Sequence, residues 1–236
     1  MRLLDLTLDS IADNLALDEA LLLEAEEASS GPLLRLWEWP HLAVVLGSGC
    51  KVAEDVDRAV CAADGVPVLR RSSGGGTVLL GAGCLCFTVV LPYTLDEALT
   101  EIRPSYHWIL ERVLTALALP GTAIDGISDL TRDGRKFSGN AQQRKRHHLL
   151  HHGTLLYAFD LPQAGRYLRM PVRQPEYRAH RPHDAFIRNL DVSRAWLVDR
   201  LRAAWAVDAE ETRWPADRVR TLAAEKYSQR EWNERR

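Results

Sequence analysis

The chain has 236 residues, which is enough for one large α/β domain or two small ones. Its composition, 46% apolar and 26% charged, is that of a globular protein with a buried core. The formal net charge of -2 excludes a whole-molecule field that would attract nucleic acid or an anionic membrane surface. We therefore expect neither among its partners, and any basic site must be local.

Three features predict a cytoplasmic protein. The N-terminus reaches an acidic residue at Asp5, too early for a secretory signal. The apolar run 85–91, one of the longest, is far shorter than a membrane span. The four cysteines form no CxxC pair and are interpreted as reduced thiols: Cys50, Cys61, Cys84 and Cys86.

Periodicity and stop signals predict a mixture of helices and strands in the first half of the chain. Asp9 and Ser10 can cap a first helix, which the Ser-Ser-Gly-Pro stretch at 29–32 ends near Ala28. The elements expected next are strands at 33–37 and 42–46, a helix at 52–63, a strand at 66–70, and a strand pair at 77–80 and 84–91.

The second half is expected to hold a long helix at 96–119, interrupted near Pro104, and a strand-rich region at 129–156 with a hairpin at Asp133-Gly134. Short helices are expected near 161–169 and 192–205. The elements do not alternate as βαβ units, and no repeat or linker divides the chain. We therefore expect a single α+β domain over 1–236, with mainly antiparallel pairing.

The sharpest local feature is a glycine turn between two expected strands, Arg70-Arg71-Ser72-Ser73-Gly74-Gly75-Gly76-Thr77. Three successive glycines cost backbone entropy and provide no packing, but they allow a ligand to approach bare backbone. Their N–H groups can bind an anion, and the flanking arginines can donate charge-assisted hydrogen bonds to a phosphate or carboxylate. The pattern is neither a Walker A loop nor a dinucleotide fingerprint. A purely structural hairpin is the alternative.

The second feature is an expected strand that carries a lysine, preceded by Asp129-Leu130: Gly134-Arg135-Lys136-Phe137-Ser138-Gly139-Asn140-Ala141-Gln142. Strand alternation would place Lys136, Ser138 and Asn140 on one face. Such a lysine can reach into a cleft and meet a carboxylate or an α-phosphate, while Asp129 could orient it or hold a magnesium ion. The alternative is an ordinary solvated lysine.

The histidine-rich stretch 147–152, followed by Gly153 and Thr154, could indicate a metal site. Zinc needs a third protein ligand and a supporting shell, and no HExxH or Cys/His set is present. A strand that ends in His152-Gly153 and lines a cleft is the preferred interpretation. The Pro-, Arg- and His-rich segment 171–188 shows no period and is expected to be a functional or mobile loop.

Together these segments resemble the lipoate–protein ligase A family, within the biotin/lipoate ligase superfamily. The resemblance covers about 14–232. The matching pieces occur in the family order and at family-like spacing: 70–78, Cys86-Phe87-Thr88, Asp129-Leu130, 134–142 and His151-His152-Gly153-Thr154-Leu155-Leu156.

The resemblance implies a mixed, mainly antiparallel curved sheet with flanking helices, similar to class II aminoacyl-tRNA synthetases. Family ligases activate lipoate with Mg-ATP, form lipoyl-AMP and transfer the acyl group to a lysine. By resemblance Lys136 is the catalytic lysine, with Asp129 beside it, and 70–77 is the acyl-binding loop. Further substrate contacts are expected from Cys86, Ser138, Gly139, Ala141, His152, Gly153 and Thr154.

The resemblance also implies acceptor partners and a mobile loop. The acceptors would be lipoyl domains of 2-oxoacid dehydrogenases or the glycine cleavage H protein. The loop 174–188 would close over the adenylate, although it lacks the Ser/Arg-rich tract of the ligases. The family's C-terminal accessory domain is absent from this chain. Activation could then need a separate accessory protein, or the chain could perform only transfer.

Three competing functions stay open. An octanoyltransferase of the same fold would use a cysteine nucleophile shortly before the lysine strand, and no cysteine lies at 121–135. Cys86 and Cys84 are expected to be small wall residues, while Cys50 could have a lowered pKa near a helix start. The second competing function is that of a non-catalytic lipoyl-carrier binding protein. The third is that of a biotin ligase, which would show a GRGRxG-like loop.

Overall fold

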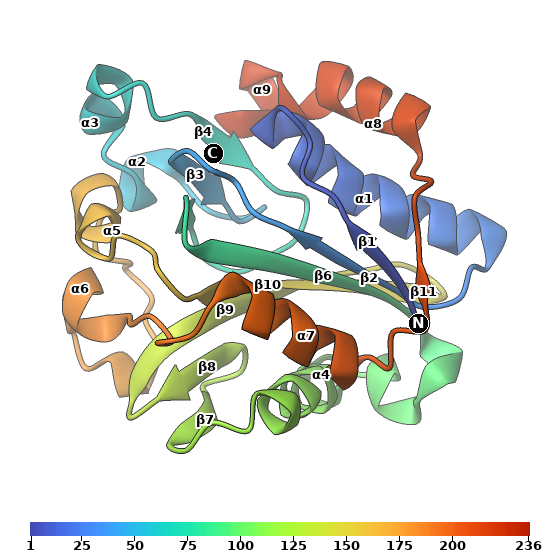
Figure 1. Ribbon diagram of the computed structural model, residues 1–236. Coiled ribbons are helices and arrows are strands. Elements are labelled where there is room, and N and C mark those ends of the chain that lie inside the picture. Colours follow the sequence, from blue (N-terminus) through green and yellow to red (C-terminus); the bar gives the residue numbers. More distant parts are fainter.

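The computed structural model describes residues 1–236 and arranges them around two β-sheets (Figure 1). The larger sheet has the strand order β11-β1-β2-β6-β10-β9-β8-β7, and the smaller one has the order β4-β3-β5. The strands are β1 (Arg2–Asp5), β2 (Leu33–Trp37), β3 (Ala43–Leu46), β4 (Val68–Arg70), β5 (Val78–Leu80), β6 (Cys84–Pro92), β7 (Thr122–Asp125), β8 (Asp129–Arg132), β9 (Arg135–Arg144), β10 (His148–Leu156) and β11 (Ala209–Glu210).

Helices cover both faces of the larger sheet. Figure 1 shows α1 and α8 on one side and α4 and α7 on the other. The α-helices are α1 (Ile11–Ala28), α2 (Val52–Asp55), α3 (Arg58–Ala63), α4 (Ile102–Leu117), α5 (Pro162–Tyr167), α6 (His183–Phe186), α7 (Arg194–Ala204), α8 (Ala216–Leu222) and α9 (Arg230–Asn233). The shorter helical turns are η1 (Tyr93–Leu95), η2 (Glu97–Thr100), η3 (Glu176–Arg178) and the π-helical η4 (Ala223–Tyr227).

The expected fold class is confirmed: the chain is α+β, and antiparallel pairs dominate the larger sheet. Burial on both faces explains why the sequence of strand β6 is a continuous apolar run. Cys84, Cys86 and Val90 point to the core beneath α1, and Leu85 and Phe87 point to the core beneath α4. Because both faces of this strand are buried, polar alternation is absent from it.

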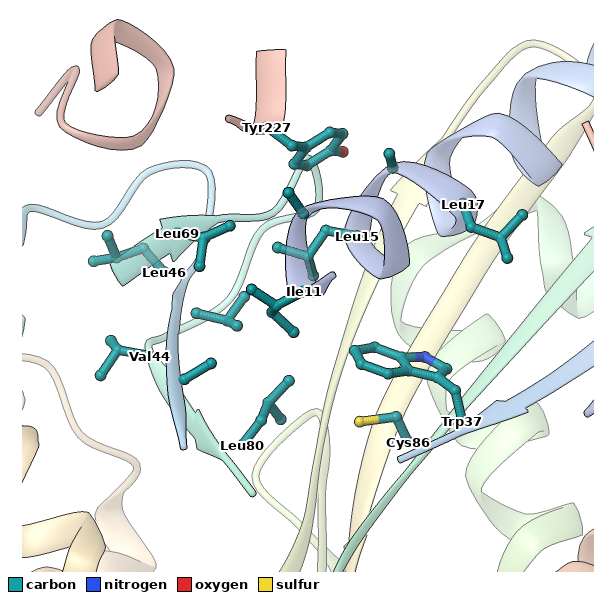
Figure 2. Close-up of a cluster of buried hydrophobic side chains, with 14 of the residues drawn as sticks. Ile11, Leu15, Leu17, Trp37, Val44, Leu46, Leu69, Leu80, Cys86 and Tyr227 are labelled. Atoms are coloured by element: carbon teal, nitrogen blue, oxygen red, sulfur yellow. The ribbon is translucent and has the colours of Figure 1, made fainter. Parts of the chain in front are cut away.

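The core beneath α1 also joins the two sheets. Figure 2 shows Ile11 and Leu15 of α1 packed between Val44 of the small sheet and Trp37 of the large sheet. Helix α1 begins as expected, because the Ser10 hydroxyl accepts the Asp13 N–H at 3.0 Å. The gap between the sheets beside this core becomes the cleft described below.

Two expected helices have different boundaries. The helix expected at 52–63 is two short helices, because Val56 is extended and pairs with Leu168, and Asp57 then caps α3. The long helix is interrupted as expected, because Glu101 is extended and separates η2 from α4 just before Pro104. This proline lies in the first turn, where a backbone N–H has no acceptor within the helix.

Several elements were not anticipated. The short strands β1, β7 and β11 were not predicted, nor were the helices after Trp205. Strands β1 and β2 pair in parallel, as do β1 and β11, so the sheet is mixed and mainly antiparallel, as expected. These elements are two to seven residues long, which is too short for a hydrophobic period to show.

No helix of the structure is both long enough and apolar enough to cross a membrane.

Candidate active site

A cleft of about 1210 Å³ lies between the small sheet and the face of the large sheet. Its buried part is apolar, with Leu15, Trp37, Val45 and Leu79 among its lining residues. Of the residues predicted from sequence, those that line the cleft are Arg71, Gly75, Gly76, Thr77, Cys86, Asp129, Lys136, Ser138, Gly139, Ala141, His152, Gly153 and Thr154.

The glycine turn forms one wall of the cleft at a point of close backbone contact. Gly75 has a φ of +82°, which L side chains rarely adopt. A Cβ on Gly47, which follows β3, would lie 2.0 Å from the Gly75 carbonyl oxygen. Gly47 is therefore required for the turn to approach β3, a role that depends on a contact between residues distant in sequence.

The buried side chain of Arg71 supports the glycine turn through hydrogen bonds. Its guanidinium donates to the carbonyl oxygens of Gly74 and Gly76 at 2.5 and 2.8 Å, and its other contacts are the Val45 carbonyl and the Ser73 hydroxyl. Burial lowers the pKa of Arg71 to about 10, so the group stays charged at neutral pH. Most of its donors are thus used inside the protein, and Arg71 acts first as a brace for the turn.

The prediction that Arg70 contacts substrate is contradicted by its position. Arg70 is fully buried outside the cleft, and its guanidinium donates to the carbonyls of Cys50 and Asn233 at 2.7 and 3.0 Å. Further carbonyl contacts reach Gly47 and Trp232. Strand alternation explains the result, because consecutive residues on a strand point to opposite sides. Ser72, Ser73 and Gly74 also lie outside the lining.

We expect Arg70→Ala to destabilise the fold by about 3 kcal/mol, because several buried carbonyl oxygens would lose their donor. Urea unfolding measures the change. Arg58→Ala is the control: it removes an exposed ion pair to Glu234, which is worth less than about 1 kcal/mol. Equal effects of the two substitutions would contradict the structural role assigned to Arg70.

A buried polar chain ties the glycine turn to α1. His152 contacts the Ser73 hydroxyl through Nε2 at 2.6 Å and the Asp18 carboxylate through Nδ1 at 3.0 Å. Asp18 also accepts from Arg35 at 2.5 Å and from Thr88 at 2.9 Å. Burial alone would raise the pKa of Asp18, but Arg35 and His152 hold it below its ordinary value. His152 therefore lines the cleft as a fixed, hydrogen-bonded wall.

Lys136 lines the same cleft, and its side chain is partly exposed. Its Nζ is 2.7 Å from Asp129 Oδ1, and its side chain lies across Gly139, where an added Cβ would be 2.8 Å from Nζ. The prediction that Lys136 shares a face with Ser138 and Asn140 is wrong. A register shift between β8 and β9 after Leu130 places Lys136 on the face of Asp129 and Gly139.

A known family fits this arrangement. A family model described as the lipoyl protein ligase A/B catalytic domain matches residues 10–205. The chain belongs to this family. Its glycine turn, its lysine strand and His152 all fall within the matched region.

Two curated members of the lipoyl ligase family illustrate its breadth. The Mycoplasma pneumoniae protein named probable lipoate-protein ligase A is 31% identical over 159 residues, covering 66% of this chain and 45% of that protein. The octanoyltransferase LipM of Carboxydothermus hydrogenoformans is 28% identical over 252 residues, covering 94% and 93%. The chain thus spans less than half of the first relative and almost all of the second. It is an enzyme of the ligase and acyltransferase family.

Solved structures of the family have the same fold. An archaeal bi-partite lipoate protein ligase, solved in a study with its E2 lipoyl domain from Thermoplasma acidophilum, is 25% identical with a TM-score of 0.80, covering 99% of this chain and 95% of that one. A T. acidophilum protein with bound lipoic acid is 25% identical with a TM-score of 0.79, covering 100% and 98%. A lipoate-protein ligase A bound with ATP has a TM-score of 0.80 at 24% identity, covering 99% and 98%.

Cys50 and Cys86, which both line the cleft of this lipoyl ligase family member, are not activated thiols. Cys50 lines the cleft, but burial raises its pKa, contrary to the lowered value suggested by its place before a helix. The pKa of Cys86 is raised well above its ordinary value, first by its hydrogen bond with Cys84 and then by burial. Both groups stay protonated at neutral pH, so neither is a ready nucleophile.

The segment 174–188, here called the covering segment, borders the same cleft through Pro175, Arg178, Phe186 and other residues. This segment, expected to be a functional or mobile loop, contains the two short helices η3 and α6. Phe186 is buried, and the guanidinium of Arg178 lies 4.5 Å from its ring centroid. This cation–π contact lets a segment with few apolar residues pack against the sheet.

The cleft residues offer few free ligands for a magnesium ion. No group of three or more His, Cys, Asp or Glu side chains is placed to hold a metal ion. Asp129, which could orient Lys136 or hold magnesium, has one oxygen on Lys136 Nζ and the other on the Tyr177 hydroxyl, each at 2.7 Å. These residues therefore do not form a protein site for the ion.

Beneath the cleft, His151 makes the stability of the fold depend on pH. Burial lowers its pKa to about 3, so it is neutral when folded and gains a proton below about pH 6.5 only when unfolded. Stability is therefore lost as the pH falls from 6.5 towards 3. We expect a loss of about 2 kcal/mol between pH 7 and pH 5, measured by urea unfolding. His151→Gln should be less pH-dependent over this range, and an unchanged slope would contradict the assignment.

Proposed function

We propose that this chain is an ATP-dependent lipoate–protein ligase, which activates lipoate with Mg-ATP to lipoyl-AMP and transfers the acyl group to a lysine of an acceptor domain. The observation that carries the proposal is Lys136, which Asp129 holds in a cleft that also has a buried apolar lining. The apolar part suits the acyl chain, and the lysine suits a carboxylate that reacts with a phosphate.

In the first step a lipoate carboxylate oxygen attacks the α-phosphorus of ATP, and pyrophosphate leaves. Negative charge gathers on the carboxylate and phosphate oxygens, and the Lys136 ammonium would offset it. In the second step the acceptor amine attacks the acyl carbonyl and AMP leaves, so that an amide forms. Gly75 and Gly76 would let these atoms approach the backbone, because neither places a side chain in the cleft.

The comparisons support both substrates. The T. acidophilum protein binds lipoic acid, and another structure of the same fold binds ATP. The archaeal bi-partite ligase was studied with an E2 lipoyl domain. We propose that residues 1–236 form a single catalytic domain of this kind, with a lipoyl domain or the glycine cleavage H protein as acceptor.

The second candidate is an octanoyltransferase, favoured by the long match to LipM. That reaction would take the acyl group from a carrier protein through a cysteine thioester, without ATP. The absence of cysteine at 121–135 and the raised pKa of Cys50 and Cys86 argue against it.

The experiment that separates the two incubates the purified protein and an apo lipoyl domain with lipoate, octanoate or octanoyl carrier protein. Each donor is used with and without ATP, and the mass of the acceptor is measured. The ligase proposal expects acylation by free lipoate only with ATP, accompanied by pyrophosphate release. Acylation by the carrier protein without ATP would establish the transferase instead.

A further inference from the structure

The covering segment contacts the pair formed by Lys136 and Asp129 through one side chain. The Tyr177 hydroxyl, in η3, donates to Asp129 Oδ2 at 2.7 Å. The other oxygen of the same carboxylate, Oδ1, lies 2.7 Å from Lys136 Nζ. One carboxylate therefore joins the tyrosine of the segment to the lysine of β9, and both of its oxygens are occupied.

Tyr177 is held firmly enough to act as a hydrogen-bond donor of fixed direction. Its ring packs on Phe186, with the centroids 5.3 Å apart. On another side it contacts the turn before β8, where a Cβ on Gly126 would lie 3.9 Å from Cε1 of the tyrosine. Burial, and next the charge of Asp129, raise the pKa of Tyr177, so its hydroxyl stays protonated.

The segment also contacts the lysine through the main chain. Ile187 forms a parallel bridge with Lys136, and the Arg188 N–H donates to the Lys136 carbonyl oxygen at 2.8 Å. The main-chain contacts set where the lysine backbone lies, and the Tyr177–Asp129 contact sets where its ammonium points. Both sets of contacts require the covering segment to be packed against β8 and β9 as observed.

We propose that Tyr177 is a positioning residue, which orients the Lys136 ammonium through Asp129 and so couples the seating of the covering segment to the reactive geometry of the lysine. The role in turnover rests on the proposed ligase function. A lysine side chain has four rotatable bonds and keeps one direction only if a partner holds it. A carboxylate anchored at one oxygen can rotate, whereas anchors at both oxygens fix the carboxylate and the ammonium together.

The test compares Tyr177→Phe with a matched control, Tyr167→Phe. Tyr167 also donates to a carboxylate, Asp64 Oδ2 at 2.8 Å, but its side chain does not line the cleft. In pyrophosphate release with lipoate and ATP, Tyr177→Phe should lower kcat about tenfold, the effect of one hydrogen bond to a charged group, with KM for lipoate unchanged. Tyr167→Phe should keep the wild-type kcat.

A double variant separates action through Asp129 from general support of the segment. If Tyr177 acts through the carboxylate, Tyr177→Phe should add little to Asp129→Asn. Additive losses, or a Tyr177→Phe enzyme with normal kcat, would overturn the proposal.

A second measurement works whether or not the wild type forms an adenylate. Brief treatment with acetic anhydride, followed by mass spectrometry, gives the labelling rate of Lys136 relative to the exposed Lys145. The ratio should rise several-fold in Tyr177→Phe and in Asp129→Asn, because the ammonium is held less tightly, and should not change in Tyr167→Phe. An unchanged ratio in Tyr177→Phe would refute the inference. If the wild type is inactive but its labelling ratio of Lys136 to Lys145 depends on Tyr177, only the ligase function would be refuted.

Discussion

Replacing Lys136 with alanine is expected to lower adenylate formation and acyl transfer about 100-fold, equivalent to roughly 3 kcal/mol of lost charge stabilisation. The lysine is partly exposed, and its main polar partner is Asp129, so its removal leaves little unpacked volume. Pyrophosphate release and acceptor mass measure the loss, and thermal unfolding should show a folded protein. Lys136→Arg should also react poorly, because a guanidinium is bulkier and its charge is more spread.

The chain offers a direct control for this experiment, since it has only four lysines. Lys145 is exposed near the β9–β10 hairpin and lies outside the cleft, so Lys145→Ala should keep normal turnover. Near-normal turnover in Lys136→Ala would remove this lysine from the mechanism. Equal losses in both variants would point to a general effect of charge.

Replacing Gly75 with valine should reduce acyl substrate binding at least tenfold. The φ of +82° costs a β-branched residue about 1–2 kcal/mol. The added Cβ would also lie 2.9 Å from Arg71 Nη2 and 3.4 Å from the Ala141 Cβ. The turn must therefore move away from β9 or lose its brace. Calorimetric titration with lipoate measures the effect on binding.

Gly74→Ala is the matched control in the same turn. Its added methyl group would have nothing within 4 Å, and its φ lies outside the positive range. Binding in this variant should stay within about twofold of the wild type. If Gly75→Val melts early yet binds lipoate normally when folded, the turn serves structure alone.

Local signals were sufficient for much of the fold. Helix α1 begins after the capping residue Ser10 and ends at the αL residue Ser29, as the sequence indicated. The Asp133-Gly134 pair makes the predicted hairpin, with φ of 53° and 70°. These predictions succeed because caps and turns are decided by a few neighbouring residues. The short strand β1 was not predicted because its partners β2 and β11 are distant in sequence.

The sequence by itself determined the family, the glycine turn and the lysine, because these are residue types at set spacings. Only the tertiary structure decided which way each side chain points. The β-bulge moves Lys136 beside Asp129, and Arg70 turns to the carbonyls of the C-terminal region while Arg71 braces the turn. The Tyr177 contact joins residues 48 positions apart. A one-residue shift reverses the face of a strand, and buried polar groups take whichever partners the packed fold brings to them.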